Sequence, residues 1–317
     1  MSKKYDQSTY HFHEITRVLS YPSRDYGDVQ WVFSPPVHCL PMRPMVVGWG
    51  PLPIFEIAKS QLHQLIRIIV RPEENLILEI CQCPNIALAK DDSSHPCHEI
   101  VNVQNHDSNE FQLPEPWNGD ITQAKLLFIS SNPSIDESEA YPTVDWPSHR
   151  ILDFFQNRFH PERKWTEDAR RVLTKDGMTY AKRTVPYWNE TRSMASDAFD
   201  RIAIPGEDYS LTEIAHCKSR SRKGVKSCAK TCFDLWMSRI ISASDARVII
   251  VLGDEAKEMM SEFLDIDSEI QFNEGVFLGN ASRIVLFLPA PGSNKIRKIS
   301  KVFSEKQRSI LKDVLNH

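Results

Sequence analysis

Several features that would define a membrane, secreted or repeat protein are missing from this sequence. No apolar run approaches the roughly 20 residues that a membrane helix needs, and the N-terminus MSKKYDQSTYHF lacks the apolar core of a signal peptide. The chain contains no internal repeat and no low-complexity tract. We therefore expect a globular, cytoplasmic protein without a membrane partner.

An excess of positive charge is also missing, because the formal net charge is −4. This argues against a surface that is basic all over, although basic residues gather in two places. The first cluster holds Lys218, Arg220, Arg222, Lys223 and Lys226, and the second holds Lys295, Arg297, Lys298 and Lys301. Such clusters are typical of a local nucleic-acid footprint, and equally of solvated charges in loops and at helix ends.

The seven cysteines include no CxxC pair. In a cytoplasmic chain they are not expected to form structural disulfides, so they are either buried thiols or metal ligands. Cys81 and Cys83 form a CxC pair, Cys97 lies in HPCH, and three more lie near the first basic cluster: Cys217, Cys228 and Cys232. Their spacing alone leaves both alternatives open.

Residues 1–115 are rich in proline, which favours irregular structure. One helix is predicted over 54–70 and one strand over 75–81. A polar stretch that ends in LPEPWNG suggests a boundary near Pro114. We therefore divide the chain into an accessory N-terminal region, residues 1–115, and a main domain, residues 116–317.

In the main domain, short apolar strands alternate with helices. The strands are predicted over 126–129, 209–216, 247–252 and 283–288, and the helices over 150–159, 167–174, 188–201, 225–243, 255–264 and 303–315. With 41% hydrophobic residues the chain can bury a large core. This alternation predicts the α/β fold class, with a parallel sheet covered by helices on both faces.

Polar or proline-containing loops follow the predicted strands, and such loops converge at one edge of a doubly wound sheet. The first is SSNPS, where Pro133 holds Asn132 in an extended conformation. The Asn132 amide could orient a water molecule or contact a base, or it could belong to an ordinary turn. The last loop, PAPGSN, could approach a phosphate backbone closely, or it could simply connect a strand to a helix.

These loops resemble the motifs of the uracil-DNA glycosylase superfamily. Ser130 to Ser134, SSNPS, is similar to the GINPG motif of the thymine/uracil mismatch enzymes, and Ala290 to Asn294, APGSN, is similar to the last motif, HPSP or MPSSS. LTEIAHCKSR and VIIVLG resemble segments of the iron–sulfur branch. Ala290 replaces the histidine of the branches that use one, and Ser130 and Ser134 replace glycines. The resemblance covers the C-terminal 200 residues.

The resemblance implies an αβα sandwich with a four-stranded parallel sheet and an enzyme that flips a nucleotide out of DNA. Asn132 would position the attacking water, with Asp136 as the next catalytic candidate, and Tyr141, Trp146 and Ser134 would contact the base. Contacts with the DNA backbone would come from Arg220, Arg222, Lys223, Pro291, Gly292, Ser293, Asn294, Lys295 and Arg297. A 4Fe-4S cluster or zinc would be bound by Cys83, Cys97, Cys217 and Cys232, with His95 or His98 as alternatives to Cys83.

The predicted substrate depends on Glu213, which stands where uracil-reading members have an asparagine. An ionised carboxylate only accepts hydrogen bonds, so it would repel O4 of uracil and suit the N4 amine of cytosine. Alternatively, Glu213 is a solvent-facing residue at a strand end. We therefore predict a monomeric, monofunctional DNA glycosylase that acts on a modified cytosine in double-stranded DNA and leaves an abasic site.

Bacterial antiphage glycosylases that remove glucosylated hydroxymethylcytosine from phage DNA are the biological precedent within the superfamily. A uracil glycosylase that repairs DNA damage is the first alternative to this prediction. A non-catalytic nucleic-acid-binding domain is the second.

Overall fold

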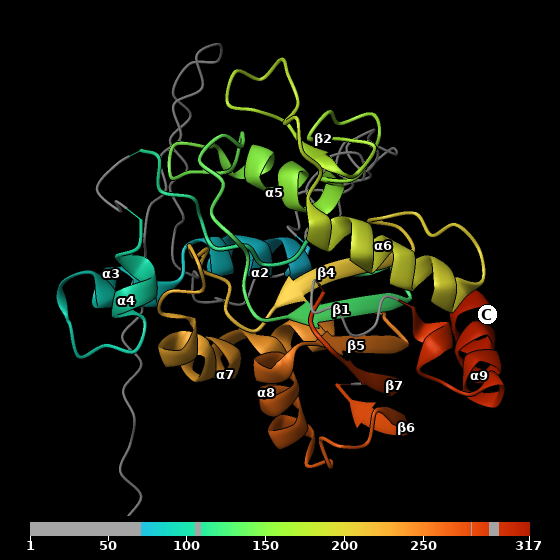
Figure 1. The fold of residues 1–317 in the computed structure, drawn as a ribbon. Coiled ribbons are helices and arrows are strands. Elements are labelled where there is room, and N and C mark those ends of the chain that lie inside the picture. The colour runs from blue at the N-terminus through green and yellow to red at the C-terminus, as the bar shows by residue number, and fades with distance from the viewer. Residues whose placement is uncertain (1–70, 105–108, 280, 292–297) are drawn as a thin grey trace, which may run out of the picture. The chain divides into compact units, whose positions relative to one another are not determined.

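A computed structural model describes residues 71–104, 109–279, 281–291 and 298–317. The predicted helix over residues 54–70 lies outside this described part. Within it, a mixed sheet of five strands carries helices on both faces, which confirms the α/β class (Figure 1).

The sheet has the strand order β4-β1-β5-β7-β6. The four predicted strands are β1 (Leu126–Ser130), β4 (Tyr209–Glu213), β5 (Val248–Leu252) and β7 (Ala281–Leu288), and neighbours among them pair in parallel. The prediction of four strands is wrong by one, because β6 (Phe272–Leu278) pairs antiparallel with β7 at the edge. Its sequence FNEGVFL mixes polar and apolar residues and is mostly not buried, so it gives no continuous apolar run.

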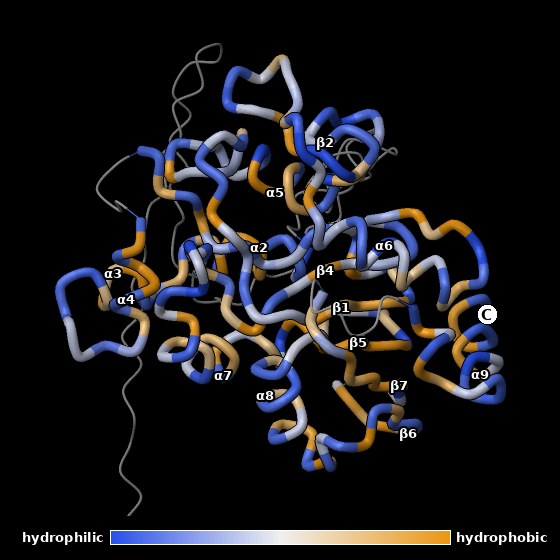
Figure 2. Tube along the Cα trace, in the orientation of Figure 1, coloured by the Kyte–Doolittle hydropathy of each residue, from blue (hydrophilic) through white to orange (hydrophobic). Residues whose placement is uncertain are grey.

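The central strands are mostly apolar because both of their faces are buried. In β1, Leu126 and Phe128 pack with α6 (Pro186–Phe199) and α9 (Glu305–Asn316). Leu127 and Ile129 point to the opposite face, where α7 (Val225–Ala243) and α8 (Asp254–Leu264) cover them. Figure 2 shows the strands as the hydrophobic centre between helices of mixed hydropathy. No helix in the described part is long and apolar enough to cross a membrane.

A further apolar core joins three helices beside the sheet. It brings together α2 (Pro72–Cys81), α5 (Ser148–Asn157) and one side of α7. Two short helices follow α2 in the chain: α3 (Pro84–Asp91) and α4 (His98–Val101). The division of the chain near residue 115 stays a prediction. The helices α2 and α4, which precede residue 115, pack directly against helices that follow it.

The strand predicted over residues 75–81 is wrong, since this segment forms most of α2. Pro72 stands at the start of the helix and Glu73 and Glu74 occupy its first turn, which are favourable positions for both residue types. The buried residues of the helix include Ile77 and Ile80 at helical spacing. The short apolar stretch from Leu76 to Leu78 concealed this pattern in the sequence.

The helix predicted over residues 167–174 is also wrong. This segment forms an antiparallel hairpin of β2 (Thr166–Glu167) and β3 (Arg171–Val172). Asp168 and Ala169 at its turn both have a positive φ of 53°, which a helix cannot accommodate. A 3-10 helix, η1 (Ile299–Lys301), precedes α9.

Candidate functional site

A cleft of about 1300 Å³ opens at the carboxyl ends of the parallel strands. The loops that follow β1, β4, β5 and β7 all contribute to it, as the topology of a doubly wound sheet requires. Asn132 and Pro291 come from two of these loops, Glu213 is the last residue of β4, and all three line the same cleft. Residues 172–190, which include β3 and the start of α6, form a further wall.

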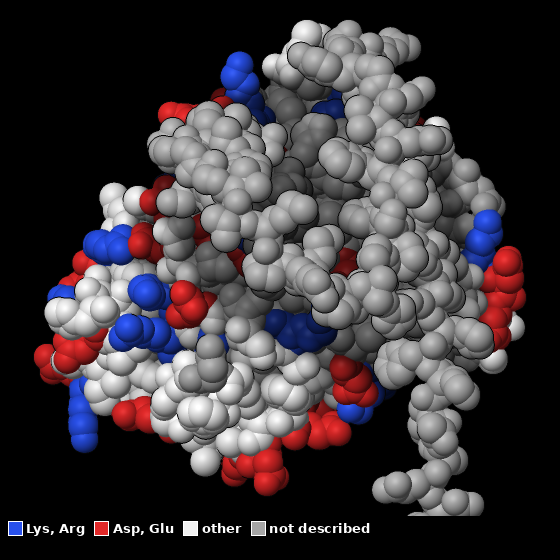
Figure 3. All heavy atoms as spheres, turned by 180° about the vertical axis from the view of Figure 1, so that it is seen from behind, with Lys and Arg blue, Asp and Glu red and all other residues white. Residues whose placement is uncertain are grey.

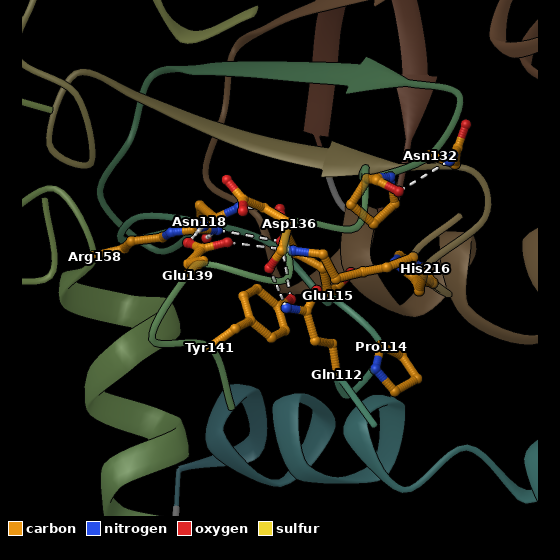
Figure 4. Close-up of polar contacts among 12 residues, drawn as sticks. Gln112, Pro114, Glu115, Asn118, Asn132, Asp136, Glu139, Tyr141, Arg158 and His216 are labelled. Carbon is orange, nitrogen blue, oxygen red and sulfur yellow. Dashed lines mark hydrogen bonds and ion pairs between the residues drawn. The ribbon is translucent and has the colours of Figure 1, made fainter. Parts of the chain in front are cut away.

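Asn132 lies half-buried in the loop after β1. Its Nδ2 donates to the carbonyl oxygen of Pro133 at 2.9 Å, and Ser131 Oγ donates to its Oδ1 at 3.3 Å. Figure 4 shows this side chain at the strand end, apart from the buried polar group described below. The amide is therefore held from both ends, and its Oδ1 retains capacity to accept a hydrogen bond from water.

Asp136 and Ser134 also line the cleft. Asp136 Oδ1 accepts from the backbone N of Ser138 at 2.9 Å and from its Oγ at 2.6 Å, so this carboxylate stabilises its own loop. Ser134 is exposed and pairs through its backbone with Ser219, which joins the loops after β1 and β4. Both residues are close to Asn132 along the chain, but only Asp136 carries an acid group.

The floor of the cleft is a buried ionic cluster of Glu115, Glu139, Arg158 and Lys218. Figure 4 shows the first three of these side chains. Arg158 Nη1 donates to Glu115 at 3.2 Å, and its Nη2 donates to Glu139. Lys218 Nζ lies 3.5 Å from Glu139 and 3.9 Å from Glu115. Two cations are thus shared by two carboxylates.

Two neutral side chains complete the hydrogen bonding of Glu115. Tyr141 Oη donates to its Oε2 at 2.9 Å and Asn118 Nδ2 donates to its Oε1 at 2.5 Å. Burial alone would raise the pKa of Glu115, but Arg158 and Lys218 bring it below the usual value. Glu115 is therefore the ionised member on which the cluster is centred.

Glu213 is the third carboxylate at this position. Arg158 and Lys218 pair with Glu115 and Glu139, and their charges only partly offset the rise in the pKa of Glu213. The side chain is only 3% exposed, it takes part in no ion pair within the described residues, and its Oε2 has no hydrogen-bond partner there. Burial raises the pKa of Glu213 well above its usual range, and the ionised Glu115 raises it further. The sequence argument took Glu213 as ionised, and its surroundings favour the neutral acid instead.

A neutral carboxylic acid has different hydrogen-bonding properties from a carboxylate. It offers one O–H donor beside one carbonyl acceptor, whereas the ionised form only accepts. Glu213 can therefore present a donor and an acceptor side by side to a ligand in the cleft. Tyr187 also lines the cleft, and its hydroxyl is buried close to Ser130 and Glu213.

Arg158, Glu115, Glu139 and Tyr187 are not among the predicted site residues. Lys218, expected in the first basic cluster, is buried in the ionic cluster instead. A signal existed for Arg158, because it follows Phe154 and Phe155 at helical spacing and therefore falls on the buried face of α5. The other members of the ionic cluster are separated by long stretches of chain and share no spacing. Nothing in the sequence points to their contact.

The two aromatic residues predicted to stack on a base lie elsewhere. Tyr141 is buried beneath the cleft, where Lys218 Nζ lies 3.5 Å from its ring centroid. Trp146 packs with Phe154 and Trp165 and lies under the guanidinium of Arg150. Neither is among the residues that line the cleft, whereas Tyr180, Tyr187 and Trp188 are.

The basic residues after β4 lie at the rim of the cleft. Arg220 and Arg222 line it and form ion pairs with Glu137 and Glu255, while Lys223 is exposed. Exposed pairs of this kind contribute little to stability, so a phosphate group could replace the carboxylates. Positive and negative side chains are mixed over the described part of the face in Figure 3. Gly292, Ser293, Asn294, Lys295 and Arg297 lie outside the described residues.

The four predicted cysteine ligands come together in the fold. Cys83, Cys97, Cys217 and Cys232 line a narrow cavity of about 10 Å³, together with a fifth thiol, Cys228. Burial raises the pKa of all five, to about 11 for Cys97 and about 12 for Cys228. Without a metal ion these groups are therefore neutral thiols.

Thiolate groups are the donors that iron–sulfur clusters and zinc require, so the chemistry of the cavity fits such a group. However, no set of three or more histidine, cysteine, aspartate or glutamate side chains in the described part is arranged as a ready metal site. A bound metal would link the segments before α3 and α4 to α7. Its role would be structural.

We expect anaerobically purified protein to contain iron or zinc, because four thiols that can ionise on metal binding share one cavity. Cys217→Ala or Cys232→Ala should remove the metal, as measured by elemental analysis. Cys81→Ala is the matched control, since Cys81 is buried nearby but does not line the cavity. Wild-type protein free of both metals would leave the cysteines as packed thiols.

The ionic cluster allows a prediction about stability. Arg158→Met should lower the free energy of unfolding by about 3–5 kcal/mol, because it leaves two buried carboxylates with Lys218 as their one remaining cation in the cluster. Urea unfolding measures the change. The control is Arg239→Met, which removes an exposed pair with Glu79 and should cost about 1 kcal/mol or less. Equal effects of the two variants would contradict a structural role for the cluster.

A scan of the sequence against protein-family models gives no match, and a search of curated proteins gives none either. The function proposed below therefore depends on the chemistry of the cleft and on the resemblance of its loops to glycosylase motifs.

Proposed function

We propose that this protein is a DNA glycosylase that extrudes a nucleotide into the cleft and excises a modified cytosine. The observation that carries the proposal is the meeting of Asn132, Glu213 and Pro291, from the ends of three parallel strands, in one cleft. The bond between sugar and base is inaccessible in a stacked duplex, so an enzyme that cleaves it needs such a pocket.

Asn132 would orient the attacking water. Its Oδ1 accepts a hydrogen bond from that water while the Nδ2 contact with Pro133 keeps the amide from rotating. The water oxygen then forms a bond to C1′ of the deoxyribose as the bond from C1′ to the base breaks. A preorganised polar group at the reacting centre lowers the barrier without having to reorganise.

Glu213 would bind the base edge and protonate the leaving group. Cytosine presents an acceptor, N3, beside a donor, the N4 amine, and the neutral acid offers the complementary pair. When the bond to C1′ breaks, its electron pair passes to the base and the Glu213 proton passes to N3. Cytosine thus leaves as a neutral molecule. The proton that the attacking water gives up reaches the Glu213 carboxylate through solvent and restores the acid.

This role of Glu213 compensates for Ala290, which stands where some members of the superfamily have a histidine. It also identifies uracil as the second candidate, because the same acid in the reverse orientation complements O4 and N3–H of uracil. Uracil already carries a proton at N3, however, so it would gain only a hydrogen bond to O4, whereas the cytosine-type base would receive the Glu213 proton at N3.

The size of the cleft favours a base with a substituent. About 1300 Å³ exceeds the roughly 300–1,000 Å³ that is typical of pockets for drug-sized ligands. Such a space accommodates a sugar-modified cytosine, the substrate of antiphage glycosylases, together with part of the DNA backbone. Arg220 and Arg222 at the rim would exchange their carboxylate partners for phosphates.

The proposal is tested by abasic-site formation on duplexes that carry uracil, cytosine, hydroxymethylcytosine or glucosylated hydroxymethylcytosine. We expect the last of these to be cleaved fastest. Rapid excision of uracil alone would favour the repair function. Binding to all four duplexes without excision from any would favour a non-catalytic DNA-binding domain.

A further inference from the structure

A turn at residues 174–179 carries an exposed methionine beside the cleft. Met178 is 81% exposed, more than the other exposed large apolar residues of the described part. The preceding residue, Gly177, has φ +68°, and a Cβ placed on it would have no atom within 4 Å. The tip of the turn therefore projects into open space.

Hydrogen bonds to Asp176 fix this turn. Its Oδ1 accepts from Thr174 Oγ1 at 2.7 Å and from the backbone N of Met178 at 2.8 Å. Its Oδ2 accepts from Thr179 Oγ1 at 2.8 Å. These bonds hold the pKa of Asp176 well below its usual range, with the Met178 amide making the largest contribution. The exposed methionine is thus presented on a defined turn.

The turn is also attached to the cleft. Thr174, Thr179 and Tyr180 line the cleft, and so do the exposed Lys182 and Arg183. The backbone N of Lys175 donates to the carbonyl oxygen of Ser138 at 2.8 Å, in the loop that begins at Asn132. An apolar tip with basic residues beside it therefore lies at the mouth of the cleft.

We propose that Met178 enters the base stack of a DNA duplex when a nucleotide is extruded into the cleft. Proteins that distort duplexes insert apolar side chains, methionine included, between base steps, which offsets part of the cost of unstacking. Lys182 and Arg183 would bind the phosphates on either side. The inference rests on the proposed glycosylase function, because only an extruded nucleotide leaves a gap to fill.

The test compares excision of the same modified base from duplex and from single-stranded DNA. Met178→Ala should slow excision from the duplex by about tenfold, which corresponds to part of the few kcal/mol that flipping costs. Excision from the single strand should not change, because no stack has to be opened there. Met178→Leu should retain the duplex activity, since it keeps a large apolar side chain.

Leu88→Ala is the matched control, because Leu88 is another exposed apolar residue but lies on α3 and does not line the cleft. It should leave both activities unchanged. Equal rates of Met178→Ala and wild type on the duplex, or an equal loss on both forms of DNA, would overturn the inference.

Failure of the proposed function gives a different result. A wild-type protein that excises no base from either form of DNA would contradict the proposed glycosylase function. The methionine is then tested by binding to a duplex that contains one abasic nucleotide. A Met178→Ala variant that binds this duplex as tightly as the wild type would overturn the insertion too.

Discussion

Replacing Asn132 with alanine is expected to lower turnover by about a hundredfold to a thousandfold. In the proposed mechanism the Asn132 amide, held by its contacts with Pro133 and Ser131, orients the attacking water. The alanine variant lacks this amide. The backbone of the loop is kept in place by Pro133, so the variant should fold normally. Single-turnover excision measures the chemical step, and circular dichroism checks the fold.

The neighbouring residue supplies the control for Asn132. Ser131→Ala removes a hydroxyl that also lines the cleft and that contacts Asn132 Oδ1 at the long distance of 3.3 Å. We expect its rate to fall much less than that of Asn132→Ala. Full activity of the Asn132 variant would place the water elsewhere, with Asp136 as the next candidate.

Glu213→Gln is expected to reduce excision of a cytosine-type base by about a hundredfold or more, the usual contribution of a general acid. The glutamine amide still donates to N3 and accepts from the N4 amine, so binding of the base should be retained. The glutamine amide cannot transfer a proton to N3. The rate constant of single-turnover excision should therefore fall while the half-saturating concentration of enzyme changes little, and any uracil excision should be unaffected.

The pH dependence provides an independent test of the neutral state of Glu213. Excision by the wild type should fall as the pH rises through the raised pKa of Glu213, since the acid is then lost. The free energy of unfolding should also decrease as the pH rises. A group whose pKa is raised in the folded state stabilises it fully below the unfolded pKa, and that stability decreases by about 1.4 kcal/mol per pH unit between the two values.

Glu213→Gln should therefore be more stable than the wild type at neutral pH and should lose this advantage towards pH 4. A variant whose melting temperature follows the wild type at every pH would show that Glu213 is ionised. The sequence-based argument, in which the carboxylate only accepts from the N4 amine, would then hold.

The elements that the sequence predicts correctly are those in which one physical signal dominates. β1 and β5 are short, entirely apolar and bounded by polar loops, so burial on both faces is the simplest explanation for them. The segment of α2 is predicted as a strand, although Pro72 and two acidic residues in the first turn mark the start of a helix. The edge strand β6 carries no comparable signal.

The residues of the candidate site also fall into those that the sequence predicts and those that it does not. Asn132 comes just after the predicted strand over 126–129 and Glu213 lies within the predicted strand over 209–216, so the topology of the sheet brings them together. Arg158 belongs to the same cleft through contacts with Glu139 and Glu115, which lie 19 and 43 residues away in the chain. Such pairings follow from how α5 packs beneath the loops, and no local pattern encodes them.

The ionic cluster also bears on the order of folding. Its members come from before β1, after β1, the end of α5 and after β4, so every one of these segments has to dock before the charges pair. Closing long loops costs entropy before such distant contacts can repay it, and solvated charges gain nothing from partial assembly. We therefore expect the floor of the cleft to form late, so incompletely folded molecules would lack a complete binding cleft.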